Sequence, residues 1–140
     1  MKNVAVLFIF MLFFSSCRKI TKDAISKNLS GYWEIEKVIL KDGSLKNYEV
    51  STTIDFIEIT SNKKGYRKKL QPDLTGKFYG SDDLEQFQIM ETDNGFWLHY
   101  ETNLMTWKEK IIEINRKKLV LQNENDIIYH YKRYEQIEVN

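Results

Sequence analysis

Few side chains in this chain have the type and spacing that catalysis needs. Cys17 is the only cysteine, and no Gly-x-Ser-x-Gly motif supplies a serine nucleophile. His99 and His130 are far apart in the sequence, and neither has a ligand-type neighbour at a spacing typical of zinc sites. No glycine-rich loop that could hold a phosphate leads from a strand into a helix. The sequence therefore predicts a protein that is not an enzyme and that has no metal site or other cofactor.

Two groups of polar residues come closest to the pattern of a catalytic or cation-binding site. His99 and Glu101 share one face of an expected strand, and Asp82, Asp83 and Glu85 gather at one turn. The first pair could exchange a proton, and the second group could hold a cation weakly. Both are also what ordinary solvated side chains look like, and we favour that interpretation.

A basic segment allows two interpretations. Lys63, Lys64, Arg67, Lys68 and Lys69 lie around one expected hairpin. They could contact anionic lipid headgroups or an acidic partner. Lysines also protect exposed strands from pairing edge to edge, so a solvated hairpin is the simpler interpretation.

The first residues of the chain have the pattern of an export signal. Lys2 is followed by an unbroken apolar run from Val4 to Phe14, then by two serines and Cys17. A transmembrane helix needs about 20 apolar residues, which is more than this run supplies. A positively charged start, a short apolar region and small residues before the cleavage site are typical of a signal peptide. We expect residues 1–16 to be this signal.

Phe14-Ser15-Ser16-Cys17 resembles the lipobox of bacterial lipoproteins. The resemblance implies that Cys17 becomes the lipid-bearing first residue and anchors the protein to the cell envelope. Arg18 is not the acidic residue that often marks retention in the inner membrane of such lipoproteins, which favours the outer membrane. An ordinary cleaved signal is the alternative. A lone lipid-bearing cysteine also agrees with an exported domain that has no disulfide framework.

Residues 17–29 form a short polar segment that we interpret as a flexible tether, although 23–29 could form a turn or two of helix. Cleavage before Cys17 would remove Lys2, one of 21 basic residues, and none of the 20 acidic residues. The remaining charge is close to zero, which argues against general nucleic-acid binding.

From Ser30 onward, strand-like segments alternate with turn signals, and the whole of 30–140 reads as one domain. Pro72 falls in one of the expected turns. The expected strands cover 32–40, 50–60, 66–71, 75–79, 84–91, 96–101, 105–114, 119–122 and 127–134. Eight or nine antiparallel strands joined by short hairpins can remove their open edges by closing into an up-and-down barrel. A Greek-key sandwich is the alternative, but it needs a longer connection than any seen here. The sequence predicts an all-β fold.

Gly31-Tyr32-Trp33 at the start of the first strand resembles the Gly-x-Trp motif of lipocalins, and Tyr129-His130-Tyr131-Lys132-Arg133 resembles the last strand of lipocalin-like bacterial lipoproteins. The resemblance implies that Trp33 plugs the closed end of a barrel, that Gly31 lets the chain enter tightly, and that Arg133 packs across the tryptophan. It also implies that a small apolar molecule binds inside.

The alternation of side chains along the strands suggests which residues line that interior. Phe96, Leu98 and Tyr100 share one face, whereas Trp97, His99 and Glu101 share the other. The expected ligand-binding residues are Phe56, Phe87, Leu98, Tyr100, Trp107 and Tyr129. These aromatic side chains could instead fill the barrel completely. The protein would then be an interaction subunit of an envelope complex rather than a ligand carrier.

Overall fold

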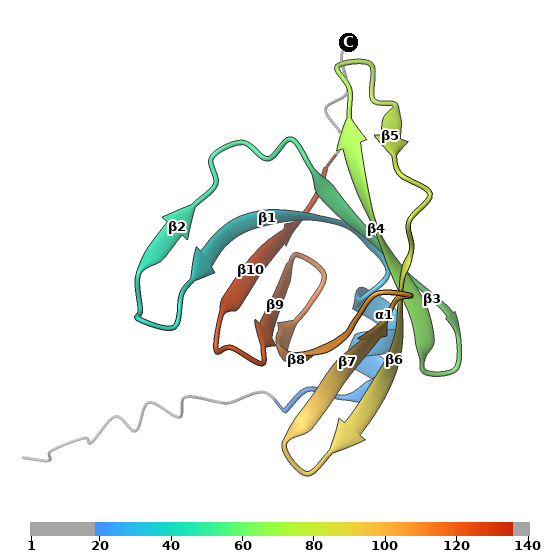
Figure 1. The fold of residues 1–140 in the computed structure, drawn as a ribbon, viewed down its shortest axis with the longest axis vertical. Coiled ribbons are helices and arrows are strands. Elements are labelled where there is room, and N and C mark those ends of the chain that lie inside the picture. Colours follow the sequence, from blue (N-terminus) through green and yellow to red (C-terminus); the bar gives the residue numbers. More distant parts are fainter. Residues whose placement is uncertain (1–18, 136–140) are drawn as a thin grey trace, which may run out of the picture.

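The computed structural model describes residues 19–135, so Cys17 and the expected signal peptide lie outside the described residues. One helix and ten strands make up the described part (Figure 1). They are α1 (Lys22–Asn28), β1 (Gly31–Ile39), β2 (Leu45–Asn47), β3 (Ile54–Ser61), β4 (Lys64–Pro72), β5 (Phe78–Gly80), β6 (Glu85–Thr92), β7 (Gly95–Glu101), β8 (Thr106–Ile114), β9 (Lys118–Asn123) and β10 (Ile128–Arg133).

The strands form a closed antiparallel barrel, which confirms the predicted fold. Eight strands follow one another around the ring as β1, β3, β4, β6, β7, β8, β9 and β10, and β10 pairs with β1 to close it. The short strands β2 and β5 lie outside the ring, on β1 and β4. β1 bends to reach both neighbours, with an irregularity between Ile35 and Lys37. Such bulges sharpen strand twist and help a sheet to close.

Three local features differ from the prediction. β2 was not predicted, because Leu45–Asn47 is short and fully exposed and so has no apolar face to reveal it. The strand expected to start at residue 50 starts at Ile54. Pro72 is the last residue of β4, opposite Phe78, and not part of a turn. Proline is tolerated there because a strand end needs no further ladder donor.

The segment interpreted as a flexible tether contains a packed helix. Thr21 caps α1 by accepting a hydrogen bond from the Ala24 amide at 3.1 Å. Ile25 and Leu29 are buried in the core cluster of the barrel. A helix of seven residues is marginal on its own, so this burial is what stabilises it. The tertiary contact therefore decides between the two alternatives that the sequence left open.

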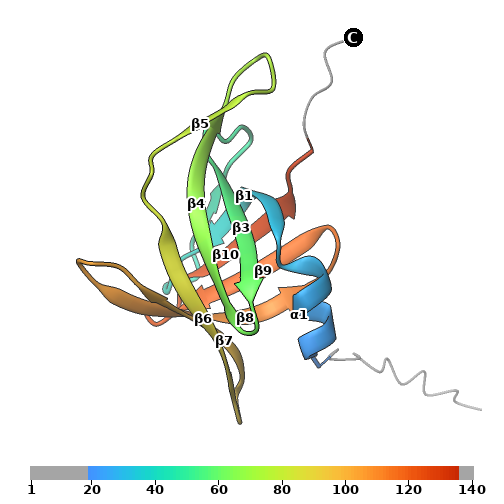
Figure 2. The same ribbon diagram turned by 90° about the vertical axis from the view of Figure 1, so that its right-hand side faces the viewer.

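The barrel has two different ends (Figure 2). We call the first the α1 end, because α1 lies there beside the β3–β4, β6–β7 and β8–β9 turns. The contacts that place them include the Lys22–Glu91 ion pair and the hydrogen bond from Arg133 Nη2 to the Asn28 carbonyl oxygen. We call the opposite end the mouth. It carries the β5–β6 loop and the β7–β8 and β9–β10 turns.

Candidate functional site

Trp33 closes the α1 end of the barrel. Its side chain is fully buried, and its Nε1 donates a hydrogen bond of 2.9 Å to the Leu29 carbonyl oxygen. The Arg133 guanidinium carbon lies 3.7 Å from the centre of the indole ring. Arg133 also donates to the carbonyl oxygens of Asn28, Ser30 and Arg116, so it ties α1 to the barrel wall.

Gly31 is required by this arrangement for two reasons. Its φ of +132° belongs to a region that side chains rarely adopt. A Cβ built on Gly31 would also lie 2.3 Å from Nη1 of Arg133. The structure thus brings together Gly31, Trp33 and Arg133, the three residues that the lipocalin resemblance singled out.

Next to Trp33 the barrel interior is filled by apolar side chains. Leu98, one of the expected ligand-binding residues, has no exposed surface and belongs to this cluster. The other members include Ile57, Ile111, Leu119 and Leu121. A ligand could reach this layer only by displacing packed side chains. A ligand would therefore bind outside this layer, either nearer the mouth or in the smaller cleft of about 340 Å³ beside α1.

A charged network crosses the interior above the apolar layer. Arg67 is 6% exposed and forms ion pairs with Glu85 and with Glu109, the latter at 3.2 Å. Its guanidinium also lies 4.5 Å from the centre of the Tyr100 ring. Burial raises the pKa of Glu109, and Arg67 opposes that rise. Close by, Lys69 reaches the buried Asp55 at 2.8 Å.

The hydroxyl of Tyr100 differs from the other polar groups of this network in its hydrogen bonding. It is buried and has no hydrogen-bond partner of acceptable geometry in the described structure. Burial raises the pKa of Tyr100, and the nearby charge of Glu109 raises it further. Buried polar groups are normally paired, and the Glu109 carboxylate beside this hydroxyl is the acceptor available to it.

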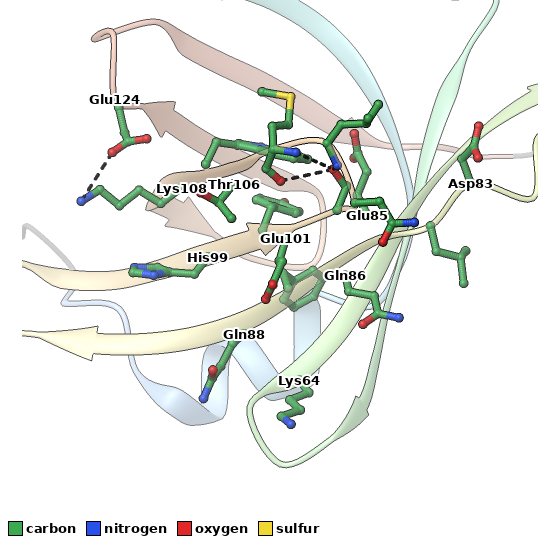
Figure 3. Close-up of a pocket in the computed structure, with 18 of the residues that line it drawn as sticks. Lys64, Asp83, Glu85, Gln86, Gln88, His99, Glu101, Thr106, Lys108 and Glu124 are labelled. Carbon is green, nitrogen blue, oxygen red and sulfur yellow. Dashed lines mark hydrogen bonds and ion pairs between the residues drawn. The ribbon is translucent and has the colours of Figure 1, made fainter.

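A groove of about 1450 Å³ lies between the β5–β6 loop and the β7–β8 turn at the mouth and extends over the outer faces of β6 and β7 as far as Lys64, Gln88 and His99 (Figure 3). Its floor is aromatic: Trp107 is half-buried there, and Tyr100 and Phe87 lie just beneath the surface, 1% and 4% exposed. The Tyr100 and Trp107 rings are stacked with centroids 4.9 Å apart, and Phe87 meets Tyr100 edge-on at 5.6 Å. This volume exceeds that of a typical small-ligand pocket, so a small molecule would occupy only part of the groove.

The rim of the groove is mixed in character. Leu84, Leu104 and Met105 expose apolar surface there, and Leu104 is 95% exposed. Charged and polar side chains also line the groove, and Figure 3 labels several of them. The labelled ones include Lys64, Asp83, Glu85, His99, Glu101, Lys108 and Glu124.

The six expected ligand-binding residues have four different locations. Phe87, Tyr100 and Trp107 line the mouth groove. Leu98 lies in the packed layer, and Tyr129 is half-buried beside the core, where its hydroxyl accepts a hydrogen bond from Asn123 at 3.3 Å. Within the β9–β10 turn, which precedes Tyr129, Glu124 is the residue that lines the groove.

Phe56 is a correction, because it lies on the outer wall and not in the interior. Its ring packs on Tyr32 and Tyr66, with centroids 4.8 and 6.1 Å away, and Phe78 covers Tyr32 from β5. Its neighbours Asp55 and Ile57 are the residues of β3 that are buried inside. Apolar residues of both parities in this strand hid the true inward face from the sequence pattern.

The polar groups noted in the sequence remain separate. His99 and Glu101 lie on the outer face of β7, opposite in direction to Leu98 and Tyr100. Asp82, Asp83 and Glu85 lie at the mouth, where Glu85 pairs with Arg67. Within residues 19–135, no three carboxylate, histidine or cysteine side chains are placed so that they could hold a metal ion.

The basic hairpin divides into parts with different roles. Arg67 points into the barrel, and Lys69 pairs with Asp55. Lys63 in the β3–β4 turn and Lys64 at the start of β4 stay exposed. Sequence reasoning missed the buried network of Arg67 and Glu109. The alternation in 66–71 places Arg67 opposite in direction to Tyr66 and Lys68, but it could not reveal a carboxylate partner 42 residues away.

The comparisons with known proteins support the fold. No family model and no curated protein matches this chain. The crystal structure of a lipocalin-like protein from Bacteroides uniformis superposes with a TM-score of 0.50 and 10% sequence identity, over 76% of this chain and 98% of that one. No helix among residues 19–135 is long and apolar enough to span a membrane. The described chain therefore has a lipocalin-like barrel fold.

Proposed function

We propose that this protein is a non-enzymatic binding protein that holds a small molecule with a flat apolar part at the mouth of its barrel. The observation that carries the proposal is the aromatic floor of the groove, where Trp107 stacks on Tyr100 beside Phe87. Binding pockets are commonly lined by aromatic side chains with a few polar groups that fix orientation. The lipocalin-like fold supports binding, because barrels of this size can hold one small ligand.

The surrounding polar groups narrow the ligand further. Acidic side chains outnumber basic ones along the groove, with Asp82, Asp83, Glu85, Glu101 and Glu124 against Lys64 and Lys108. We therefore expect a neutral or cationic ligand rather than an anionic one, since like charges repel across a partly desolvated surface.

We also propose that the protein is a lipoprotein of the bacterial cell envelope, anchored through an acylated Cys17, and more specifically of the outer membrane. The export signal of residues 1–16 and the lipobox-like 14–17 support this proposal. Both lie outside the described residues. Native mass spectrometry of the protein extracted from membranes tests it directly, because the mass reports the acyl chains on Cys17 and any small molecule that copurifies.

Titration with N-phenyl-1-naphthylamine, a neutral aromatic probe whose fluorescence rises in apolar surroundings, tests the groove. We expect saturable binding to the wild-type protein and a loss of about tenfold in affinity for Trp107→Ala. A tenfold change corresponds to about 1.4 kcal/mol, and an aromatic contact contributes about 0.5–1.5 kcal/mol beyond the area it buries. Trp97→Ala is the matched control, because Trp97 lies on the outer face of the adjacent strand, under Lys108 and Lys110. Equal affinities of the two variants would place binding elsewhere.

A second candidate is an interaction subunit whose barrel presents the mouth to another envelope protein. Two observations favour it, namely the packed layer around Leu98 and the exposed apolar rim of Leu104 and Met105. Exposed apolar residues beside a polar rim often mark protein contacts. A Leu104→Ser, Met105→Ser variant separates the two functions, because it should weaken a protein complex and leave probe affinity nearly unchanged.

A further inference from the structure

Basic side chains from distant parts of the sequence gather at the α1 end of the barrel. The β3–β4 hairpin contributes Lys63 and Lys64, the β8–β9 turn contributes Arg116 and Lys117, and Lys19 precedes α1. All five are exposed. The Arg116 carbonyl oxygen accepts a hydrogen bond from Arg133, which also binds the Asn28 carbonyl oxygen, so the β8–β9 turn lies beside the end of α1. The Lys63 side of the β3–β4 turn shares a cleft of about 340 Å³ with α1.

The acidic side chains at this end are nearly all taken up by other bases. Glu91 pairs with Lys22 at 2.7 Å, and Asp23 pairs with Lys27 at 2.9 Å. Glu113 lies 4.0 Å from Lys118. Asp93 in the β6–β7 turn and Glu135 after β10 are the remaining acids near this end of the described chain, so the five bases named above keep an excess of positive charge.

The mouth has the opposite character. Asp82, Asp83 and Glu101 line its groove, and Asp126 lies in the β9–β10 turn. Lys108, one of the bases at the mouth, pairs with Glu124 at 3.5 Å. The near-zero net charge of the domain therefore hides a separation of charge along the barrel, with the positive side at the α1 end.

The α1 end is also where the chain would meet its anchor. Four residues lie between Cys17 and Lys22, the first residue of α1, and an extended chain covers at most about 18 Å over these five Cα–Cα steps. An acylated Cys17 therefore holds the α1 end close to the headgroups. The Debye length at physiological salt is about 8 Å, so basic groups tethered at this distance can reach the surface field of the bilayer.

We propose that the α1 end is a membrane-docking surface, whose exposed lysines and arginine rest on the anionic headgroups of the bilayer while the mouth faces away from it. This inference rests on the proposed lipid anchor. It favours a lipid surface over an acidic protein because the basic groups surround the point where the anchor leaves the domain. It also implies that the ligand reaches the groove from the aqueous side.

The test uses the protein purified from membranes with its lipid and reconstituted into vesicles. Cys17 is the only cysteine, so a cysteine introduced at Asn94 or Asn103 can be labelled alone with a fluorophore. Asn94 lies in the β6–β7 turn at the α1 end, and Asn103 lies in the β7–β8 turn at the mouth. Quenching by a lipid-borne quencher then reports which end approaches the bilayer.

We expect the Asn94→Cys label to be quenched in vesicles that contain one-third phosphatidylglycerol and much less in pure phosphatidylcholine or in 1 M salt. The Asn103→Cys label should be quenched in neither. A Lys63→Ala, Lys117→Ala variant should lower the docking equilibrium constant about 30-fold, given the usual contribution of each basic group near such a surface. A Lys41→Ala, Lys77→Ala variant is the matched control, because it removes the same charge away from the α1 end.

Equal quenching of Asn94→Cys in both kinds of vesicle, or equal effects of the two double variants, would overturn the docking surface. A failure of the anchor has a different signature, since mass spectrometry would then show Cys17 without acyl chains. In that case flotation of the purified wild-type protein and the two double variants with the same vesicles decides the docking proposal. Loss of binding in Lys63→Ala, Lys117→Ala alone would support it, and no preference for phosphatidylglycerol would refute it.

Discussion

Replacement of Gly31 by alanine tests the closed end of the barrel. The substitution forces a side chain into a φ of +132° and places a Cβ 2.3 Å from Nη1 of Arg133. The backbone strain costs about 1–3 kcal/mol. The collision also moves Arg133, whose stacking on Trp33 is worth about 0.5–2 kcal/mol. Each carbonyl bond that its charged side chain loses costs about 1.5–3 kcal/mol. We expect the free energy of unfolding to fall by about 3–5 kcal/mol in total.

Gly43→Ala is the matched control for the backbone contribution. Gly43 also has a positive φ, +83°, but a Cβ there would have no heavy atom within 4 Å. We expect Gly43→Ala to cost only about 1–2 kcal/mol, from the backbone alone. Urea unfolding followed by tryptophan fluorescence measures both values.

A double-mutant cycle with Arg133→Ala isolates the collision. Once the guanidinium is absent, Gly31→Ala should lose only the backbone contribution and come close to Gly43→Ala. The predicted coupling between positions 31 and 133 is therefore about 2 kcal/mol or more. Additive effects of the two substitutions would refute the reasoning, because the position of Arg133 would then not require that residue 31 lacks a side chain.

Three further predictions concern the interior. Leu98→Ala should destabilise the protein by about 2–5 kcal/mol in the same urea assay, whereas Leu104→Ala should change stability by less than about 0.5 kcal/mol, because only Leu98 is packed. Tyr100→Phe removes a buried hydroxyl without a partner, so chemical denaturation should show unchanged or slightly increased stability; a loss above about 1 kcal/mol would mean that the hydroxyl is paired. Burial raises the pKa of Glu109, so the stability associated with its protonated form is complete below the unfolded pKa and is lost as pH rises through the folded value. The stability of Glu109→Gln relative to wild type should therefore increase from pH 4 to pH 7 in thermal melts. A relative stability that falls over that range would contradict the assignment.

The regular parts of the barrel could be predicted from the sequence because they depend on local patterns. Strict alternation in 96–101 sends Phe96, Leu98 and Tyr100 inward, and short turns between successive strands leave closure as the way to remove both edges. Gly31 and Trp33 could be identified early for the same reason, since a motif at the start of a strand is local. The candidate site was harder to predict from the sequence. Only three of the six expected ligand-binding residues line the groove.

The failures at the site concern choices between faces or partners. In β3 both parities carry apolar side chains, and only the pairing with β1 and β4 turned Phe56 outward onto Tyr32 and Tyr66. A strand pattern of this kind defines two faces without saying which one is enclosed. The short α1 was equally undecided until Ile25 and Leu29 found a surface that buries them.

Local sequence thus determined where strands begin and turn, and with them the meander that closes into a barrel. Tertiary structure alone decided the charge arrangement. Arg67 lies among lysines in the sequence, yet Glu85 and Glu109, 18 and 42 residues further on, draw it into the interior. In the same way, turns far apart along the chain carry Lys63 and Lys117 to one end of the barrel. The physical reason is that a charge responds to neighbours in space, whereas hydrophobic alternation is written residue by residue along each strand.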